Sequence, residues 1–213
     1  MAKKLNQPSK KGLPAGYTPS ISEAQHYFKK WQTMPLYVDE DLALSVLFRG
    51  SNSYYRLNDS LDKILVKVAT LNDFYSTQIR RIYDLALKIA SIPDLDNRLV
   101  KGDISLVNDI RRNSYTNMSG DTHVRDDYSF ATKFCSAHNP ALFPIYDKYV
   151  MLVLCDLKKQ YPNVFTFPNK DSLRDYAVFK QALDDLKNHW NSLSGLDYKE
   201  LDRYLWLLGK NYF

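Results

Sequence analysis

A lysine and an aspartate in the stretch 129–150 have residue types and surroundings suited to covalent chemistry. Lys133 lies in a helix-like run among apolar neighbours. Burial of its stem would lower the pKa of the ammonium and free the amine to attack an electrophile. Asp147 follows a loop that contains two prolines and begins the next apolar run, where an N-cap residue would hold its carboxylate rigidly. The pair therefore predicts nucleophilic catalysis by an amine with an assisting carboxylate.

The same two residues also fit a purely structural role. In a helical hairpin, Lys133 could extend its ammonium to water while Asp147 only caps a helix. The two interpretations differ in geometry. Catalysis requires both groups to reach one cavity between their helices, whereas the structural role leaves the lysine in solvent and needs no cavity.

Composition describes a globular chain. Of its 213 residues 45% are hydrophobic and 14% aromatic, which is enough for one generous core and excludes a disordered chain. No run reaches the roughly 18 apolar residues of a membrane span, and no signal-peptide-like segment is visible, so we expect a cytoplasmic protein without a membrane partner. Cys135 and Cys155 are expected to be free thiols. The four histidines lack metal-ligand spacing, and we expect no metal and no other cofactor.

The positive charge is concentrated at the N-terminus. The formal net charge is +5, but residues 1–20 contain four lysines and no acid, so the remainder carries little net charge. We interpret residues 1–20 as a flexible basic tail that either contacts an anionic polymer or only aids solubility.

Apolar residues recur at helical spacing along nearly the whole chain, and no alternating strand pattern is visible. The sequence predicts an all-α fold over residues 21–213, either one compact multi-helix domain or two helical lobes with a cleft between them. Polar loops are expected at 51–58 and 113–125, and Asp126 and Asp127 as the N-cap and first-turn acids of the lysine helix. Helices are expected near 21–34, 39–49, 59–72, 77–90, 95–101, 104–110, 126–138, 147–161, 171–190 and 197–209.

Two separated stretches carry a family resemblance. In residues 70–83 an apolar helix ends in a polar Ser-Thr-Gln cluster and a second helix follows at once. Residues 131–135 (Ala-Thr-Lys-Phe-Cys) begin the lysine helix, and Asp147 heads the next one. Together they resemble the helix–hairpin–helix DNA glycosylase superfamily, especially its 8-oxoguanine DNA glycosylase-like branch. The resemblance covers roughly residues 60–155, with a wedge element about 60–90 and a catalytic hairpin about 126–160.

The resemblance implies a specific activity. It implies a DNA glycosylase with AP lyase activity, whose partner is double-stranded DNA with a lesion or modified base. Lys133 would attack the sugar C1′ of an extruded nucleotide, and Asp147 would stabilise the positive charge that develops there. The polar cluster would enter the minor groove, and two arginines would contact flanking phosphates; these DNA-binding residues are Tyr75, Ser76, Thr77, Gln78, Arg80 and Arg81.

Two further features bear on the resemblance. His138 and Trp206, the latter with Tyr204 and Tyr212, could line the base pocket, although His138 also fits a helix end and the aromatic residues fit a core. The family usually has a Gly-rich hairpin before the lysine that grips a phosphate, whereas residues 124–130 contain no glycine here.

Two other functional classes are compatible with the sequence. The chain could be a non-catalytic helical module that binds nucleic acid or protein through its tail and aromatic residues. It could also be a defence or toxin-type protein that uses the lysine and aspartate differently.

Overall fold

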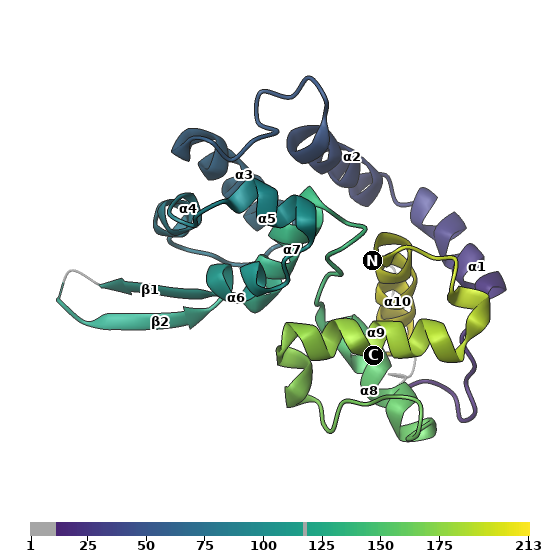
Figure 1. The fold of residues 1–213 in the computed structure, drawn as a ribbon. Coiled ribbons are helices and arrows are strands. Elements are labelled where there is room, and N and C mark those ends of the chain that lie inside the picture. Colours follow the sequence, from purple (N-terminus) through teal and green to yellow (C-terminus); the bar gives the residue numbers. More distant parts are fainter. Residues whose placement is uncertain (1–11, 117–118) are drawn as a thin grey trace, which may run out of the picture.

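The computed structural model describes residues 12–116 and 119–213, which form a helical domain with one short β-hairpin (Figure 1). This confirms the predicted helical fold class. The α-helices are α1 (Ile21–Gln32), α2 (Pro35–Arg49), α3 (Leu61–Phe74), α4 (Ile82–Ala90), α5 (Leu95–Lys101), α6 (Ser105–Arg111), α7 (Tyr128–His138), α8 (Lys148–Gln160), α9 (Tyr176–His189) and α10 (Tyr198–Tyr212). Strands β1 (Arg112–Thr116) and β2 (Thr122–Asp126) and the 3-10 turns η1 (Asp171–Arg174) and η2 (Asn191–Leu193) complete the described chain.

The helices form two neighbouring groups around one continuous core. Helix α10 packs against α8 and α1, while α3 packs against α4, and α6 against α7. Figure 1 shows α1, α8, α9 and α10 on one side, and α3 to α6 with the β-hairpin on the other. One hydrophobic cluster runs through both groups, so the described residues form a single compact domain.

Local sequence signals explain several helix ends. Ser20 accepts a hydrogen bond from the Glu23 amide at the start of α1, and Asp197 and Glu200 form a reciprocal capping box at the start of α10. Gly209 lies where α10 crosses α8, and a Cβ there would stand 2.7 Å from the Cβ of Tyr149. The helices can approach this closely because residue 209 has no side chain.

The main departure from prediction lies between α6 and α7. Residues 113–125, expected to form a polar loop, instead contribute two antiparallel strands in which Arg112 pairs with Asp126 and Asn113 with Arg125. Polar residues with β-branched neighbours satisfy their backbone groups in a two-stranded ladder as well as in a loop, and no apolar alternation marks them. Asp126 therefore ends β2 and is not a first-turn helix acid, and Asp127 occupies the N-cap position without a side-chain capping bond.

Three other boundaries differ. Helix α4 begins at Ile82 and not near Thr77, because residues 75–81 form an irregular turn. Helix α2 begins at Pro35, a residue suited to the first helical turn. The stretch expected to be one helix from residue 171 is divided into η1 and α9 at Asp175, which caps α9.

Part of the expected N-terminal tail packs on the domain. Leu13 is buried and its amide donates to Asp156 Oδ2 at 2.8 Å, while the Gly12 amide donates to the Tyr212 carbonyl. The expectation of a flexible tail over all of 1–20 is therefore wrong for residues 12–20, and the four lysines of the tail lie outside the described residues. Among the helices that the structure describes, none is long and apolar enough to cross a lipid bilayer.

Candidate active site

A cavity of about 270 Å³ lies where α7, α10 and α2 meet, next to the end of α3. Five of the residues singled out from the sequence line it: Tyr75, Ser76, Lys133, Asp147 and Trp206. They come from four separate parts of the chain. The cavity that distinguishes the catalytic from the structural interpretation of Lys133 is therefore present, and both Lys133 and Asp147 face it.

Lys133 is buried on α7, with 6% of its surface exposed. Its ammonium donates to Ser129 Oγ at 2.7 Å and lies 5.2 Å from the centroid of the Tyr75 ring. Burial lowers the pKa of the Lys133 ammonium, while the negative charges of Asp147 and Asp202 oppose this shift. A larger fraction of this amine is consequently neutral, and nucleophilic, than for a lysine in water.

Asp147 is held by the first turn of α8. Its Oδ1 accepts a hydrogen bond from the Tyr149 amide at 2.8 Å, as the N-cap prediction required. The preceding residue is attached to α7 twice, since the Tyr146 amide donates to Thr132 Oγ1 and the Tyr146 carbonyl accepts from Ser129 Oγ. These bonds fix the carboxylate relative to the helix that carries the amine.

Helix α10 contributes a second carboxylate to the cavity that sequence reasoning missed. Asp202 Oδ1 is buried and makes no hydrogen bond with any described residue. Burial raises the pKa of this carboxyl to about 7, against the influence of the Lys199 ammonium. Lys199 itself forms an ion pair with Asp41 of α2 at 2.7 Å. On sequence alone these charged residues resemble the solvated face of an amphipathic helix, and no local signal distinguishes them.

One end of the cavity is aromatic. Trp31 of α1, Tyr37 of α2 and Trp206 of α10 meet edge-to-face or tilted, with the Trp206 ring centroid 5.9 Å from that of Trp31 and 5.2 Å from that of Tyr37. The Lys210 ammonium lies 3.8 Å from the Trp206 centroid. Such an arrangement can receive a flat, polarizable ring.

Trp31 and Tyr37 were not identified from the sequence. Tyr204 and Tyr212 do not line the cavity, and Tyr204 is a fully buried core residue.

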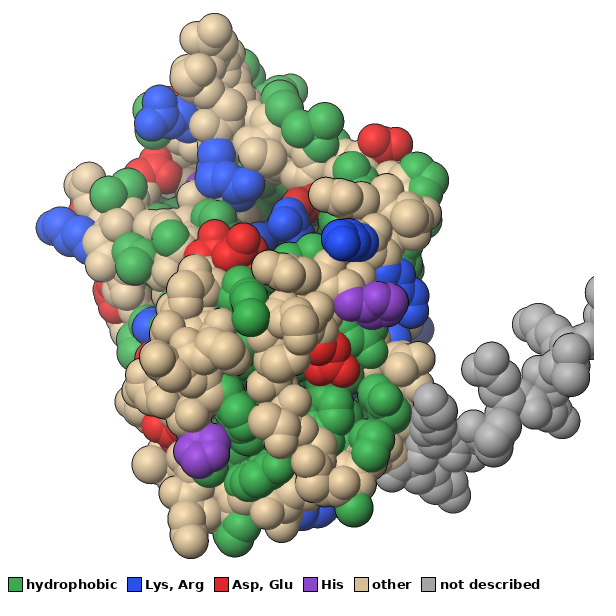
Figure 2. Space-filling model, turned by 90° about the vertical axis from the view of Figure 1, so that its right-hand side faces the viewer, with side chains coloured by type: hydrophobic (Ala, Val, Ile, Leu, Met, Phe, Trp, Pro, Cys, Tyr) green, Lys and Arg blue, Asp and Glu red, His purple; other side chains and the backbone are tan. Residues whose placement is uncertain are grey.

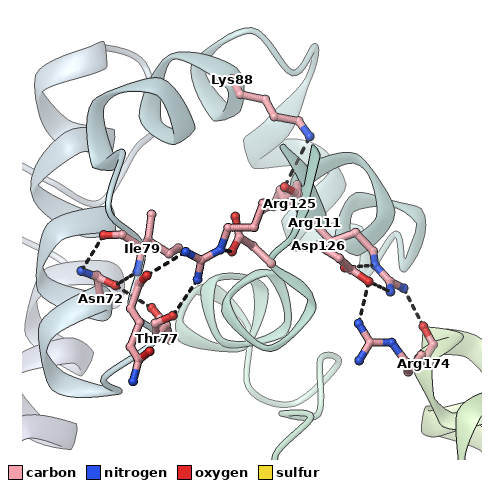
Figure 3. A network of polar contacts seen from close by, with 11 residues as sticks. Asn72, Thr77, Ile79, Lys88, Arg111, Arg125, Asp126 and Arg174 are labelled. Carbon is pink, nitrogen blue, oxygen red and sulfur yellow. Dashed lines mark hydrogen bonds and ion pairs between the residues drawn. The ribbon is translucent and has the colours of Figure 1, made fainter. Parts of the chain in front are cut away.

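The predicted wedge residues form a turn with unusual backbone geometry. Ser76 and Gln78 both have positive φ, at 47° and 58°. The side chain of Asn72 holds the turn from inside, accepting from the Thr77 hydroxyl at 2.9 Å and from the Ile79 amide at 2.7 Å (Figure 3). Tyr75 and Ser76 line the cavity, while Thr77 and Gln78 do not.

Three further predicted residues, besides Thr77 and Gln78, lie outside the cavity. Arg80 and Arg81 line a separate small notch beside Arg125 of the hairpin, and Arg81 forms an ion pair with Asp84. His138 ends α7, where its Nε2 lies 3.3 Å from Asn58 Nδ2 and burial moves its pKa well below the ordinary value. His138 lines a different hollow from Lys133, and its position as the last residue of α7 agrees with the helix-end interpretation. Over the described part of the chain, no three His, Cys, Asp or Glu side chains gather as metal ligands would.

The face of the molecule drawn in Figure 2 has mixed charge. On the face drawn in Figure 2, Lys and Arg side chains lie mainly in the upper half, with acidic and apolar side chains among them. This face is therefore not a continuous basic surface.

Comparison with known proteins places the chain in a family. Residues 23–142 match the family model HI_0787_N, described as an N-terminal domain. The chain belongs to this family. A protein of Haemophilus influenzae, named only as uncharacterized, is 41% identical over 160 residues that span 75% of this chain and 73% of the relative. No solved structure matches the chain.

The matched segment contains only part of the cavity. It includes the turn at 75–78 and Lys133, but it ends before Asp147 and all of α10. The second carboxylate and the Trp206 ring therefore come from the C-terminal part of the chain, which folds back onto the family domain.

Proposed function

We propose that the protein is a DNA glycosylase with AP lyase activity that uses Lys133 as its nucleophile. The observation that carries the proposal is the convergence of a buried amine, an N-cap carboxylate and an aromatic cavity, with Lys133 and Asp147 both facing the cavity. A non-catalytic binding module would have no need to bury an ammonium in this way, because burying a charge costs free energy unless the group is used or paired.

The chemistry follows from these groups. The neutral Lys133 amine forms a bond from Nζ to the sugar C1′, and the C1′–N glycosidic bond breaks with its electron pair leaving on the base, which takes up a proton. Nζ loses a proton and the C1′–O4′ bond opens, giving an imine between Nζ and C1′. The Asp147 carboxylate stabilises the positive charge at C1′ while the bonds exchange. Loss of a proton from C2′ then expels the 3′ phosphate by β-elimination, which is the lyase step.

The cavity suits an extruded base. A base inside a duplex must leave the stack before its sugar can meet Nζ, at a cost of a few kcal/mol. Trp31, Tyr37 and Trp206 offer rings against which a flat base can pack, and Asp202 supplies a polar group for its edge. The turn at 75–78 lies at the cavity wall, where Tyr75 and its polar neighbours can occupy the gap left in the duplex.

We infer that the partner is duplex DNA carrying a damaged or modified base. The resemblance in residues 60–155 also supports this inference. Arg80 and Arg81 follow the turn and line a small hollow beside it, and in this proposal they contact the phosphates that flank the lesion. A cytoplasmic location is part of the same proposal, since both cysteines are unpaired thiols.

Reductive trapping tests the proposal directly. The protein is incubated with borohydride and duplex oligonucleotides that carry an abasic site, an oxidised purine or no lesion. We expect a covalent adduct on at least one lesion duplex, and its loss in Lys133→Gln. Lys148→Gln, which removes an exposed lysine next to Asp147, serves as the matched control and should trap like the wild type. Absence of any adduct, or an adduct that persists in Lys133→Gln, would overturn the proposal in favour of a non-catalytic module.

A further inference from the structure

The β-hairpin between α6 and α7 carries one arginine that reaches back to the turn at 75–78. Arg125 of β2 donates from Nη1 to the Gln78 carbonyl at 2.8 Å and from Nη2 to the Thr77 carbonyl at 3.1 Å. Its Nε donates to Asp127 Oδ1. Figure 3 shows the Arg125 side chain directed at the turn that contains Thr77 and Ile79. A single side chain thus connects two elements that are more than forty residues apart in sequence.

The turn needs such support. Left-handed backbone at Ser76 and Gln78 is unfavourable for residues with a Cβ and persists only where neighbouring groups hold it. Asn72 holds the inner side of the turn through Thr77 and Ile79. Arg125 stabilises the outer side of the turn, because its planar, charged guanidinium donates hydrogen bonds to the carbonyls of two consecutive residues.

The other end of the guanidinium is fixed to the helix that carries Lys133. Asp127 directly precedes α7, its side chain is 2% exposed, and its amide donates to the Arg111 carbonyl at 2.7 Å. Asp127 Oδ2 is buried and has no hydrogen-bond partner in the described structure, so the ion pair with Arg125 is the main direct compensation of this carboxylate. Removing the arginine would leave a buried carboxylate without its ion-pair partner.

The hairpin is itself anchored at its base. Asp126 forms ion pairs with Arg111 at 2.6 Å and with Arg174 at 2.7 Å (Figure 3). The hairpin otherwise projects away from the domain (Figure 1). Arg125 is therefore presented from a fixed base, and its contacts with the turn are tertiary and not local.

We propose that Arg125 is a positioning residue that holds the 75–78 turn in its left-handed conformation and at a fixed position relative to the Lys133 helix. The turn would then have its DNA-binding conformation before duplex DNA binds. This inference rests on the proposed function. According to this inference, the hairpin contributes to extrusion of the base and does not contribute to the covalent step. Extrusion is required from a duplex but not from a single strand, and this difference separates the two tasks.

The test compares one variant on two substrates. Arg125→Ala is measured by single-turnover base release from a lesion duplex and by borohydride trapping on a single-stranded abasic oligonucleotide. We expect about a tenfold or greater loss on the duplex, with trapping on the single strand within about twofold of wild type. Arg112→Ala removes an exposed arginine from the neighbouring strand and should leave both rates near wild type. Arg125→Lys keeps the charge without the planar fork and should not restore the duplex rate.

A second measurement does not depend on activity. Hydrogen exchange of the amides at 76–81 should accelerate in Arg125→Ala and remain unchanged in Arg112→Ala. Equal losses of Arg125→Ala on both substrates, or unchanged exchange in the turn, would overturn the inference. A wild-type protein that traps no substrate would overturn the proposed function instead, and exchange in the turn would then still decide whether Arg125 holds it.

Discussion

Lys133 and Ser129 lie one helical turn apart on α7, and the ammonium donates to the serine oxygen at 2.7 Å. The serine hydroxyl in turn donates to the Tyr146 carbonyl at 3.2 Å, at the residue that precedes Asp147. One hydroxyl therefore links the amine to the chain segment that presents the carboxylate. The amine of Lys133 and the carboxylate of Asp147 are therefore connected through the Ser129 hydroxyl, and no direct hydrogen bond joins them among the contacts of the described residues.

Removal of the Ser129 hydroxyl should alter how the adduct depends on pH. The hydrogen bond favours the charged ammonium, so its loss lowers the pKa of Lys133 beyond the lowering that burial causes. In Ser129→Ala the acidic limb of the pH profile for trapping should move to lower pH, with a smaller maximal rate. Ser129→Thr retains the hydroxyl and should keep the wild-type profile. A limb that moves to higher pH would contradict this role for Ser129.

Substitutions of Asp147 should distinguish the contribution of its negative charge to catalysis from the contribution of its helix cap to stability. Asparagine caps helices about as well as aspartate, so Asp147→Asn should keep the melting temperature while slowing base release about 100-fold. Asp147→Ala removes both functions and should also cost about 1 kcal/mol of unfolding free energy. Melting curves and single-turnover kinetics measure the two effects. Equal base-release rates in Asp147→Asn and wild type would exclude an electrostatic role for the carboxylate.

Asp202 should make stability fall as pH rises toward neutrality. Burial raises its pKa in the folded protein to about 7, so between pH 4 and pH 7 the folded state binds more protons than the unfolded state. Over this window the wild type loses stability relative to Asp202→Asn, by about 3 kcal/mol. Urea unfolding of both proteins at pH 4, 6 and 8 measures the difference. A stability gap independent of pH would show that Asp202 titrates normally.

Gly209 should tolerate no larger residue where α10 crosses α8. Alanine favours helices over glycine by about 1 kcal/mol, but its Cβ would stand 2.7 Å from the Tyr149 Cβ and 2.8 Å from the Tyr149 carbonyl oxygen. We expect Gly209→Ala to lose about 2 kcal/mol and to lower the melting temperature by about 5 °C. At Gly195 a Cβ meets nothing within 4 Å, so Gly195→Ala should be neutral. If Gly209→Ala were more stable than the wild type, α10 and α8 could move apart to accommodate the methyl group without a loss of unfolding free energy, which would contradict this prediction.

The helical spacing of apolar residues in the sequence was sufficient to predict most of the helices of the fold. It predicted the helical class, and the capping residues Ser20, Asp147 and Asp197 begin helices as expected. Lys133 and Asp147 were expected at one cleft, flanked by Tyr75 and Ser76 of the turn that the family resemblance indicated, and all four line the cavity. The helical class and the helix caps could be predicted because they depend on local patterns that tertiary packing does not reverse.

The features that were missed depend on long-range contacts. Asp202 and Lys199 look like an exposed helix face until α2 and α7 cover them, and the Trp31 ring belongs to a helix that sequence order separates from the cavity. The hairpin strands are polar and short, and Arg125 binds main-chain carbonyls that carry no sequence signature. Residue types could not predict these pairings, because they arise from the three-dimensional path of the chain.

The cavity wall is assembled from segments at both ends of the described chain, Trp31 on α1 and Trp206 on α10. Without α10 the Lys133 amine would lose one wall of the cavity that keeps it from water, and the lowering of its pKa by burial would diminish. The depressed pKa of Lys133 therefore requires the C-terminal helix as well as the helix that carries the lysine.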